Sequence, residues 1–194
     1  MKRILIFFAL SVILVLNGSP FAATLPPVKG STLPAFSLPI PKNASEKTYL
    51  GLSGDGSFKV PQIKAEVVLI ELFSLYCPYC QSSAPGLNEL YQLIENNPET
   101  KGKIKMIGIG AGNSAFEVET FRKTYGVVFP LFPDKDFAIH KALGDVRTPY
   151  FIAIKIKTDR THEVIHSELG GFAGAQAYLE VILKASGLGQ GGKP

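Results

Sequence analysis

The chain has 194 residues, of which 46% are apolar and 19% charged, so it suits one packed domain with a short appendage and excludes wholesale disorder. Twenty Lys and Arg residues stand against 16 Asp and Glu, and two of the excess positive charges, Lys2 and Arg3, lie at the extreme N-terminus. The remaining charge is nearly balanced, which gives no indication of a nucleic-acid partner. Two cysteines cannot build a multi-disulfide scaffold or a four-thiolate metal site.

The N-terminus resembles a secretory signal. Its basic start is followed by an apolar run over residues 4–16, whereas a helix that spans a membrane needs about 20 residues. We expect residues 1–23 to be a signal peptide or a retained N-terminal anchor. A buried N-terminal helix is the alternative, and the Pro-rich stretch that follows disfavours it. The chain is therefore expected in the bacterial periplasm, where disulfides persist.

The rest of the chain divides into a Pro-rich extended lead-in at 24–45, a main domain at 46–186 and a flexible tail at 187–194. Residues 67–73 are β-branched and apolar on both faces, which is typical of a buried central strand. Apolar residues from Cys80 to Ile94 recur at spacings of three and four, which predicts a helix that ends at 96–98. The other predicted elements are an edge strand at 58–63, strands at 103–109, 150–156 and 163–168, and helices at 114–125, 137–143 and 175–184.

Strands that alternate with crossover helices imply a parallel core, and the terminal hairpin adds antiparallel strands. The sequence therefore predicts an α/β fold, a three-layer sandwich around a central mixed sheet. Ser114 is the expected N-cap of the helix at 114–125, with Glu117 three residues further on.

Both cysteines lie in one Cys-x-x-Cys motif, where the buried strand passes into the helix. We expect Cys77 at the helix N-terminus, where free N–H groups and the helix dipole stabilise a thiolate. Pro78 suits the first turn because it has no N–H to lose. Cys80 is expected to be more buried and to resolve a mixed disulfide by attacking Cys77. The pair is therefore the predicted redox-active disulfide, and we expect no cofactor.

Two other uses of the cysteines are disfavoured. A structural disulfide across so short a loop would remove little entropy from the unfolded chain. A zinc site could recruit His162 and His166, but their distance in sequence from the cysteines is far longer than in compact zinc folds. We therefore expect no metal site, and we expect His140 to be a surface residue of its short helix.

Glu71 is the one charge inside the apolar strand, on the same face as Leu69 and Phe73. We expect it to be buried, to have a raised pKa and to accept the proton of Cys80; the alternative is that it points to solvent at the sheet edge.

Pro149 begins the strand at 150–156, which is a position that a sheet tolerates for proline. A cis bond here, opposite the cysteines, would expose the backbone of Thr148 to pair with a bound partner, although Thr-Pro alone is usually an ordinary turn.

Together, the strand acid, the Cys-x-x-Cys motif and the late X-Pro resemble the thioredoxin superfamily in spacing. The likeness to the exported TlpA/ResA group of thiol–disulfide oxidoreductases covers about residues 33–184, and its most similar segments are 33–38, 106–109, 121–130 and 146–151. It implies a thioredoxin-like domain over 46–186. By position, the resemblance makes Cys77 the attacking thiol, Cys80 the resolving thiol, Glu71 the buried acid and Pro149 the cis-proline.

The sequence departs from that group at two positions. Tyr76 stands where the group usually has Trp, and Glu71 replaces the commoner Asn or Asp. Residues 70–74 and the Cys-Pro-Tyr-Cys motif also resemble the DsbA-like oxidases, so the direction of electron flow stays open. The expected partner-binding residues surround Cys77 and the X-Pro: Tyr76, Pro78, Tyr79, Thr148 and Pro149.

The resemblance implies an exported oxidoreductase that acts on protein thiols and disulfides. The likeness to the TlpA/ResA group favours the role of a reductant. Partners in the related group include apocytochrome c and copper-site proteins, and electrons would come from a membrane donor. The chain itself would touch the membrane only through an anchor at residues 4–16.

Three alternatives remain. A DsbA-like thiol oxidase or isomerase is the closest, but the interval between Cys80 and Pro149 leaves no space for its large helical insertion. A peroxidase is the second alternative. Peroxiredoxins have a Thr or Ser three residues before their reactive Cys, which Ser74 matches, but also a Pro four residues further back, where this chain has Ile70. A copper metallochaperone of the Sco type has a Cys-x-x-x-Cys spacing, one residue longer than here, although soft thiolates suit Cu(I).

Overall fold

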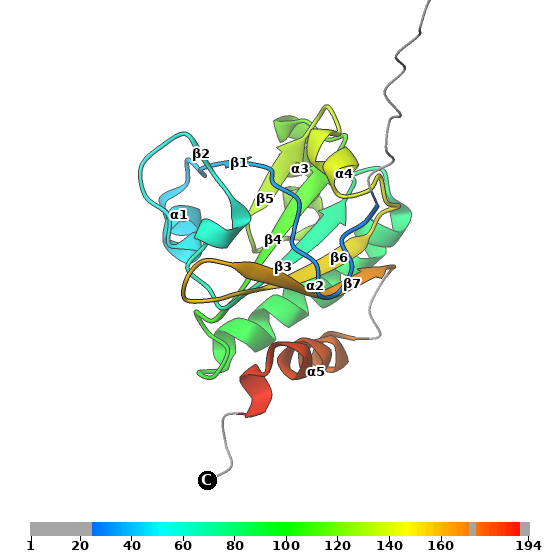
Figure 1. Ribbon diagram of the computed structural model, residues 1–194. Coiled ribbons are helices and arrows are strands. Elements are labelled where there is room, and N and C mark those ends of the chain that lie inside the picture. Colours follow the sequence, from blue (N-terminus) through cyan, green and yellow to red (C-terminus); the bar gives the residue numbers. More distant parts are fainter. Residues whose placement is uncertain (1–24, 171–173, 191–194) are drawn as a thin grey trace, which may run out of the picture.

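The computed structural model describes residues 25–170 and 174–190. The predicted signal or anchor, part of the glycine-rich segment before the last helix and the final four residues lie outside the described residues. Five strands form the central sheet in the order β5-β4-β3-β6-β7, with helices on both faces (Figure 1). The first three run parallel, and β6 and β7 are antiparallel to their neighbours. The predicted three-layer α/β sandwich around a mixed sheet is confirmed.

Strand β3 is the centre of the molecule because it pairs with β4 on one side and β6 on the other, and all of its residues are buried. A strand enclosed in this way needs apolar side chains on both faces, as its sequence shows. The strands are β3 (Val67–Phe73), β4 (Ile104–Ala111), β5 (Leu131–Asp134), β6 (Tyr150–Ile156) and β7 (His162–Leu169).

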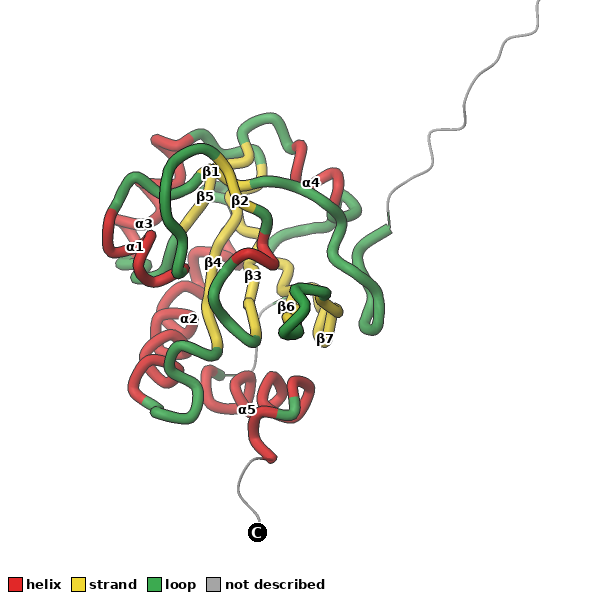
Figure 2. Tube along the Cα trace, turned by 60° about the vertical axis from the view of Figure 1, so that its left-hand side comes forward, coloured by secondary structure: helices red, strands yellow, loops and turns green. Residues whose placement is uncertain are grey.

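Two apolar clusters, one on each face of the sheet, hold the layers together. Helices α2 (Pro78–Asn96), α3 (Ala115–Tyr125) and α5 (Ala175–Ser186) contribute to the first. Helices α1 (Ala44–Leu50) and α4 (Ala138–Ala142) and the 3-10 helix η1 (Val60–Gln62) contribute to the second. Figure 2 shows α5 at the bottom with α2 next to it, α1 at the left and α4 at the upper right. Each fully buried Leu or Ile in these clusters is worth about 1.5–3 kcal/mol.

The structure adds elements that the sequence analysis missed. Helix α1 lies within and just after the predicted extended lead-in, between an Asn43 N-cap and a left-handed Gly51. A two-residue strand β1 (Leu38–Pro39) pairs with β2 (Ser57–Phe58). The strand predicted at 58–63 is wrong beyond Phe58, because the chain turns into η1 with Pro61 in its first turn.

The chain after α5 also differs from the flexible tail that was predicted from Gly187. Gly187 caps α5 in a left-handed conformation, and Leu188–Gln190 form a second 3-10 helix, η2. The cause is apolar burial, since Leu188 packs against the cluster beneath α5.

The lead-in runs along the outer edge of β7. The N–H of Gly30 donates to the carbonyl of Val164 at 2.8 Å, and the N–H of Val164 donates to the carbonyl of Ser31 at 2.8 Å. Leu33 adds a bond from its N–H to Nε2 of His162 at 3.1 Å. The backbone groups of Val164 that face away from β6 are therefore paired.

Candidate active site

Cys77 is the N-cap of α2, as its place in the sequence predicts. The N–H of Cys80 donates to Sγ of Cys77 at 3.3 Å, and Pro78 occupies the first turn. Cys77 is partly exposed, whereas Cys80 is buried; both are free thiols. The free N–H groups of the first helical turn, together with the helix dipole, favour a negative charge at this sulfur.

A second element meets the cysteine from the far side of the chain. The thiol of Cys77 donates to the carbonyl oxygen of Thr148 at 3.3 Å, and the Thr148–Pro149 peptide bond is cis. Pro149 immediately precedes β6, which is paired with β3, and α2 follows β3 directly. Adjacent strands thus bring the helix start and the X-Pro segment together.

The two thiols differ in acidity. Burial raises the pKa of the Cys77 thiol. Its hydrogen bonds with the side chains of Cys80 and Thr148 and with the backbone of Cys80 and Tyr79 outweigh that effect, so the pKa lies below its ordinary value. Burial raises the pKa of Cys80 well above its ordinary value, and the hydrogen bond to Cys77 adds to that rise. The partly exposed sulfur is therefore the more acidic of the two and ionises first as pH rises.

Glu71 is buried, 4% exposed, so the burial predicted for it is found and the solvent-facing alternative is not. Neither of its carboxylate oxygens has a hydrogen-bond partner within residues 25–170 and 174–190. Burial raises its pKa to about 8, and the charge of Cys77 adds to the shift. Glu71 in turn raises the pKa of Cys80, so the carboxyl lies within electrostatic reach of both thiols.

Two tyrosines are exposed here, one just before the Cys-x-x-Cys motif and one within it. Tyr76 is 70% exposed and Tyr79 is 74% exposed. The hydroxyl of Tyr76 donates to Oε1 of Glu117, and Oε2 of Glu117 accepts from the N–H and hydroxyl of Ser114, each at 2.7 Å. These bonds lower the pKa of Glu117 to about 2. The predicted capping box of α3 is thus present. Its Glu117 also holds the side chain of Tyr76, the residue before Cys77.

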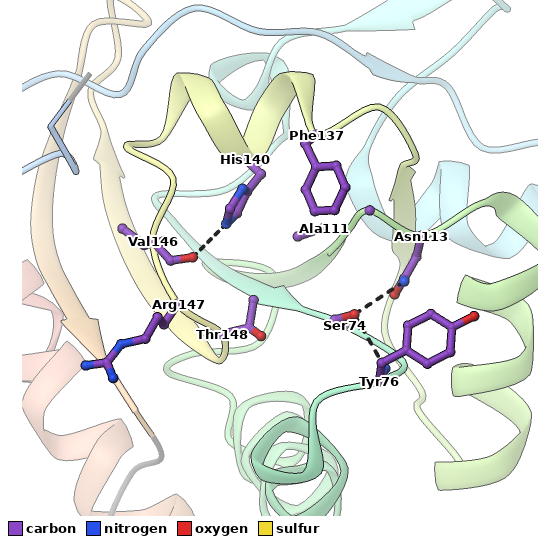
Figure 3. A pocket seen from close by; sticks show the side chains of 10 residues that line it. Ser74, Tyr76, Ala111, Asn113, Phe137, His140, Val146, Arg147 and Thr148 are labelled. Atoms are coloured by element: carbon purple, nitrogen blue, oxygen red, sulfur yellow. Dashed lines mark hydrogen bonds between the residues drawn. The ribbon is translucent and has the colours of Figure 1, made fainter. Parts of the chain in front are cut away.

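A cavity of about 590 Å³ opens beside Thr148 (Figure 3). Its lining combines apolar and polar side chains from the ends of β3 and β4, from α4 and from the segment before β6. The lining residues are Ser74, Tyr76, Ala111, Gly112, Asn113, Phe137, His140, Val146, Arg147 and Thr148.

The expectation that His140 is a surface residue is wrong. Its Nε2 lies 2.6 Å from the carbonyl oxygen of Val146, and its Nδ1 lies 2.9 Å from Oδ1 of Asp145. The carboxylate of Asp134, at the end of β5, accepts from the N–H groups of Ile139 and His140 and so fixes α4 against the sheet. His140 is buried because its helix packs against the sheet at this end.

The other two histidines make contacts elsewhere in the fold. His162 accepts the N–H of Leu33, and the ring of His166 packs edge-on against Tyr178 at 5.3 Å. Among the described residues there is no group of three or more His, Cys, Asp or Glu side chains that could hold a metal.

Asn113 is a site residue that the sequence analysis missed. It is completely buried, and its Oδ1 accepts from the N–H of Leu75, two residues before Cys77. The available signal was its position: it stands between a predicted strand and the predicted N-cap Ser114, at the sheet edge where the cysteines lie.

Comparison with known proteins agrees with this geometry. A family model described as Redoxin matches residues 28–182. The chain belongs to the Redoxin family. The thiol-disulfide oxidoreductase ResA of Bacillus cereus is 26% identical to this Redoxin-family chain over 178 residues, which cover 87% of the chain and 97% of that protein.

Solved structures share the Redoxin-family chain's fold. The thioredoxin domain of a thiol-disulfide oxidoreductase from Bacteroides vulgatus aligns with a TM-score of 0.58 at 15% identity, over 79% of this chain and 96% of that one. A thiol:disulfide interchange protein of the thioredoxin family from Chlorobium tepidum aligns with a TM-score of 0.55 at 16% identity, over 82% and 98%. The predicted thioredoxin-like fold and the likeness to the ResA group are confirmed.

No helix in residues 25–170 and 174–190 is long and apolar enough to cross a membrane.

Proposed function

We propose that this Redoxin-family protein is an exported thiol–disulfide oxidoreductase whose Cys77–Cys80 pair reduces disulfides of partner proteins. The observation that carries the proposal is the contrast between the two sulfurs. Cys77 is partly exposed, caps a helix and has a lowered pKa, whereas Cys80 is buried one turn further on and has a raised pKa. This is the division of labour between an attacking and a resolving thiol.

In the first step the Cys77 thiolate attacks one sulfur of a partner disulfide. A sulfur–sulfur bond forms between Cys77 and the partner, the partner's own disulfide breaks, and its second sulfur leaves as a thiolate that takes a proton from water. The N–H of Cys80 stabilises the attacking sulfur, and the backbone of Thr148 lies beside it, where an extended partner segment could pair. Tyr76, Pro78, Tyr79 and Pro149 complete the proposed contact surface.

In the second step Glu71 accepts the proton of Cys80, whose thiolate attacks Sγ of Cys77. The Cys77–Cys80 disulfide forms, the mixed disulfide breaks, and the partner leaves with its second thiolate, which is then protonated. The charge of Cys77 contributes to the raised pKa of Glu71. Once that charge is lost in the mixed disulfide, Glu71 ionises more readily and can take up the proton at the moment when Cys80 must react.

We propose the direction of electron flow from the helices and strands that lie between Cys80 and Pro149. Between Cys80 and Pro149 the structure contains only β4, α3, β5 and the short α4 after α2, without a large helical insertion. This supports a ResA-like reductant, with partners such as apocytochrome c and re-reduction by a membrane thiol donor. Export rests on the basic and apolar N-terminal residues.

One observation favours the opposite direction. The lowered pKa of Cys77 stabilises the reduced form, which is how a DsbA-like oxidase gains its oxidising power. The reduction potential of the pair, measured by equilibration with glutathione, separates the two. We expect a value close to the roughly −270 mV of thioredoxin; a value close to the roughly −120 mV of DsbA would overturn the reductant role and support the oxidase.

A further inference from the structure

The segment between β3 and α2 has no regular structure of its own, yet it must hold Cys77 in place. Sγ of Cys77 makes two contacts at 3.3 Å, with the N–H of Cys80 and with the carbonyl of Thr148. A rotation of the preceding peptides would break both contacts. Whatever fixes residues 74–76 therefore fixes the nucleophile.

The side chain of Asn113 reaches this segment from the connection between β4 and α3. Its Oδ1 accepts from the N–H of Leu75 at 2.8 Å, and its Nδ2 donates to Oγ of Ser74 at 3.4 Å. Figure 3 shows the amide directed at Ser74 from the cavity wall. Asn113 is 0% exposed, so water cannot replace these bonds. The task needs one acceptor and one donor on a short neutral side chain, which an amide supplies.

The same peptide is held from a second side. Nε2 of Gln81, in the first turns of α2, donates to the carbonyl of Leu75 at 2.7 Å. The N–H and the carbonyl of Leu75 are thus both occupied by side-chain amides, one from each neighbouring element. Such a residue cannot rotate its backbone without losing two partly buried hydrogen bonds.

The backbone of the β4–α3 connection is shaped to present Asn113. Gly112 has a φ of +67°, and a Cβ there would lie 2.1 Å from the ring of Phe137. The N–H of Asn113 then donates to the carbonyl of Gly110 at 3.0 Å, and Ser114 starts α3. A tight turn and a helix cap therefore fix both ends of the residue.

We propose that Asn113 is a positioning residue for thiol–disulfide exchange: by locking the backbone of Leu75, it holds the sulfur of Cys77 on the N–H of Cys80 and beside Thr148. This inference rests on the proposed function of the cysteine pair and extends it to a residue outside the motif. Loss of the amide would let the segment move and weaken the bond that stabilises the Cys77 thiolate.

The test compares Asn113→Leu with Asn88→Leu. Asn88, on α2, donates from Nδ2 to the carbonyl of Tyr125 at 3.1 Å, so its replacement also removes an amide contact but leaves the cysteine segment intact. The thiolate titration of the reduced proteins is followed by absorbance at 240 nm and by the rate of alkylation with iodoacetamide. We expect the midpoint of Asn113→Leu to rise by roughly one pH unit and its alkylation below the midpoint to slow about tenfold.

Asn88→Leu is expected to lower the melting temperature without moving the midpoint. If Asn113→Leu folds and keeps the wild-type midpoint, the proposal is overturned. Should that variant fail to fold, Gln81→Leu, on the partly exposed surface of α2, removes the other bond to Leu75 and should raise the midpoint in the same direction; an unchanged midpoint there would also overturn the proposal. Neither readout uses a protein partner, so failure of wild-type protein to exchange with partners would reject the proposed function alone.

Discussion

Sγ of Cys77 and the carbonyl oxygen of Thr148 lie 3.3 Å apart, although 71 positions separate the two residues in the chain. The contact exists because β3 and β6 are neighbours in the sheet, so the segment after one and the segment before the other meet at the same end. The backbone of Thr148 therefore lies beside the sulfur that we propose attacks a partner disulfide.

Replacing Cys80 with Ser should trap partners on Cys77 as mixed disulfides. The reason is that the serine hydroxyl lacks the sulfur that releases the partner in the second step. Non-reducing electrophoresis of the exported fraction of producing cells, followed by reduction and mass spectrometry, would reveal the trapped species. Cys77→Ser is the matched control and should trap none. An exported Cys80→Ser protein without adducts would contradict the exchange role.

Glu71→Gln should slow the second step far more than the first. The amide keeps the size of the side chain but cannot accept the Cys80 proton, a loss worth about 100-fold in rate. Rapid-mixing kinetics with a fluorescent disulfide substrate resolves formation of the mixed disulfide from its decay. Glu66→Gln, at a position just before β3, is the control. Equal slowing of both steps would argue against proton acceptance by Glu71.

Glu71 should also give the fold a pH dependence. Its pKa rises from 4.5 to about 8 on folding, so between these values the folded state retains a proton that the unfolded state has lost. Below about pH 4.5, Glu71 therefore costs the folded state no free energy. As pH rises toward 8, the free energy of unfolding falls by at most about 1.4 kcal/mol per pH unit. Chemical denaturation of a variant with both cysteines replaced by Ser isolates the effect. Adding Glu71→Gln should flatten the slope over this range; an unchanged slope would show that another group causes it.

Tyr79→Ala should weaken reaction with protein partners and leave reaction with glutathione unchanged. The ring is 74% exposed beside Cys77, so it can contribute contact area only to a large partner. Removal of an exposed side chain should change stability by less than about 0.5 kcal/mol. The check compares second-order rate constants for a protein disulfide and for oxidised glutathione. Val181→Ala, at a half-exposed position on α5, serves as control. Parallel loss with both substrates would place Tyr79 in the chemistry instead.

Gly112→Ala should destabilise the protein more than Gly126→Ala. Both glycines have a left-handed φ, +67° and +62°, so each alanine costs about 1–2 kcal/mol for the backbone. A Cβ at Gly126 meets nothing within 4 Å, whereas one at Gly112 strikes the ring of Phe137, which should add about 1–3 kcal/mol. Urea denaturation measures the difference. Equal costs would mean that Phe137 moves aside freely.

The sequence predicted the elements with strong local signals. The strand at 150–156 has the observed bounds, and the capping box of Ser114 and Glu117 locates the start of α3. Strand β5 was missed because it has only four residues, of which Pro133 is one. Helix α1 was missed because the prolines of the lead-in predicted an extended chain, although Asn43 and Gly51 cap the helix.

The candidate site divides in the same way. Glu71 could be recognised because it is a charge inside an apolar strand. The cysteines could be recognised because they form a Cys-x-x-Cys motif where that strand passes into a helix. Asn113 and the burial of His140 depend on side chains that meet only after the sheet and helices have packed. No local pattern distinguishes an asparagine that bonds a distant backbone N–H from one in an ordinary turn.

The backbone bonds of Gly30 and Ser31 to Val164 cover part of the outer edge of β7 with the chain's own lead-in. An uncovered margin is where sheets of separate molecules join, which leads to strand exchange and aggregation. If the protein exchanges disulfides with other proteins, as we propose, it binds extended segments of their chains. Because the lead-in already pairs with Val164, such a segment cannot add to β7 at that residue, and the cysteine end remains the place where we propose that it binds.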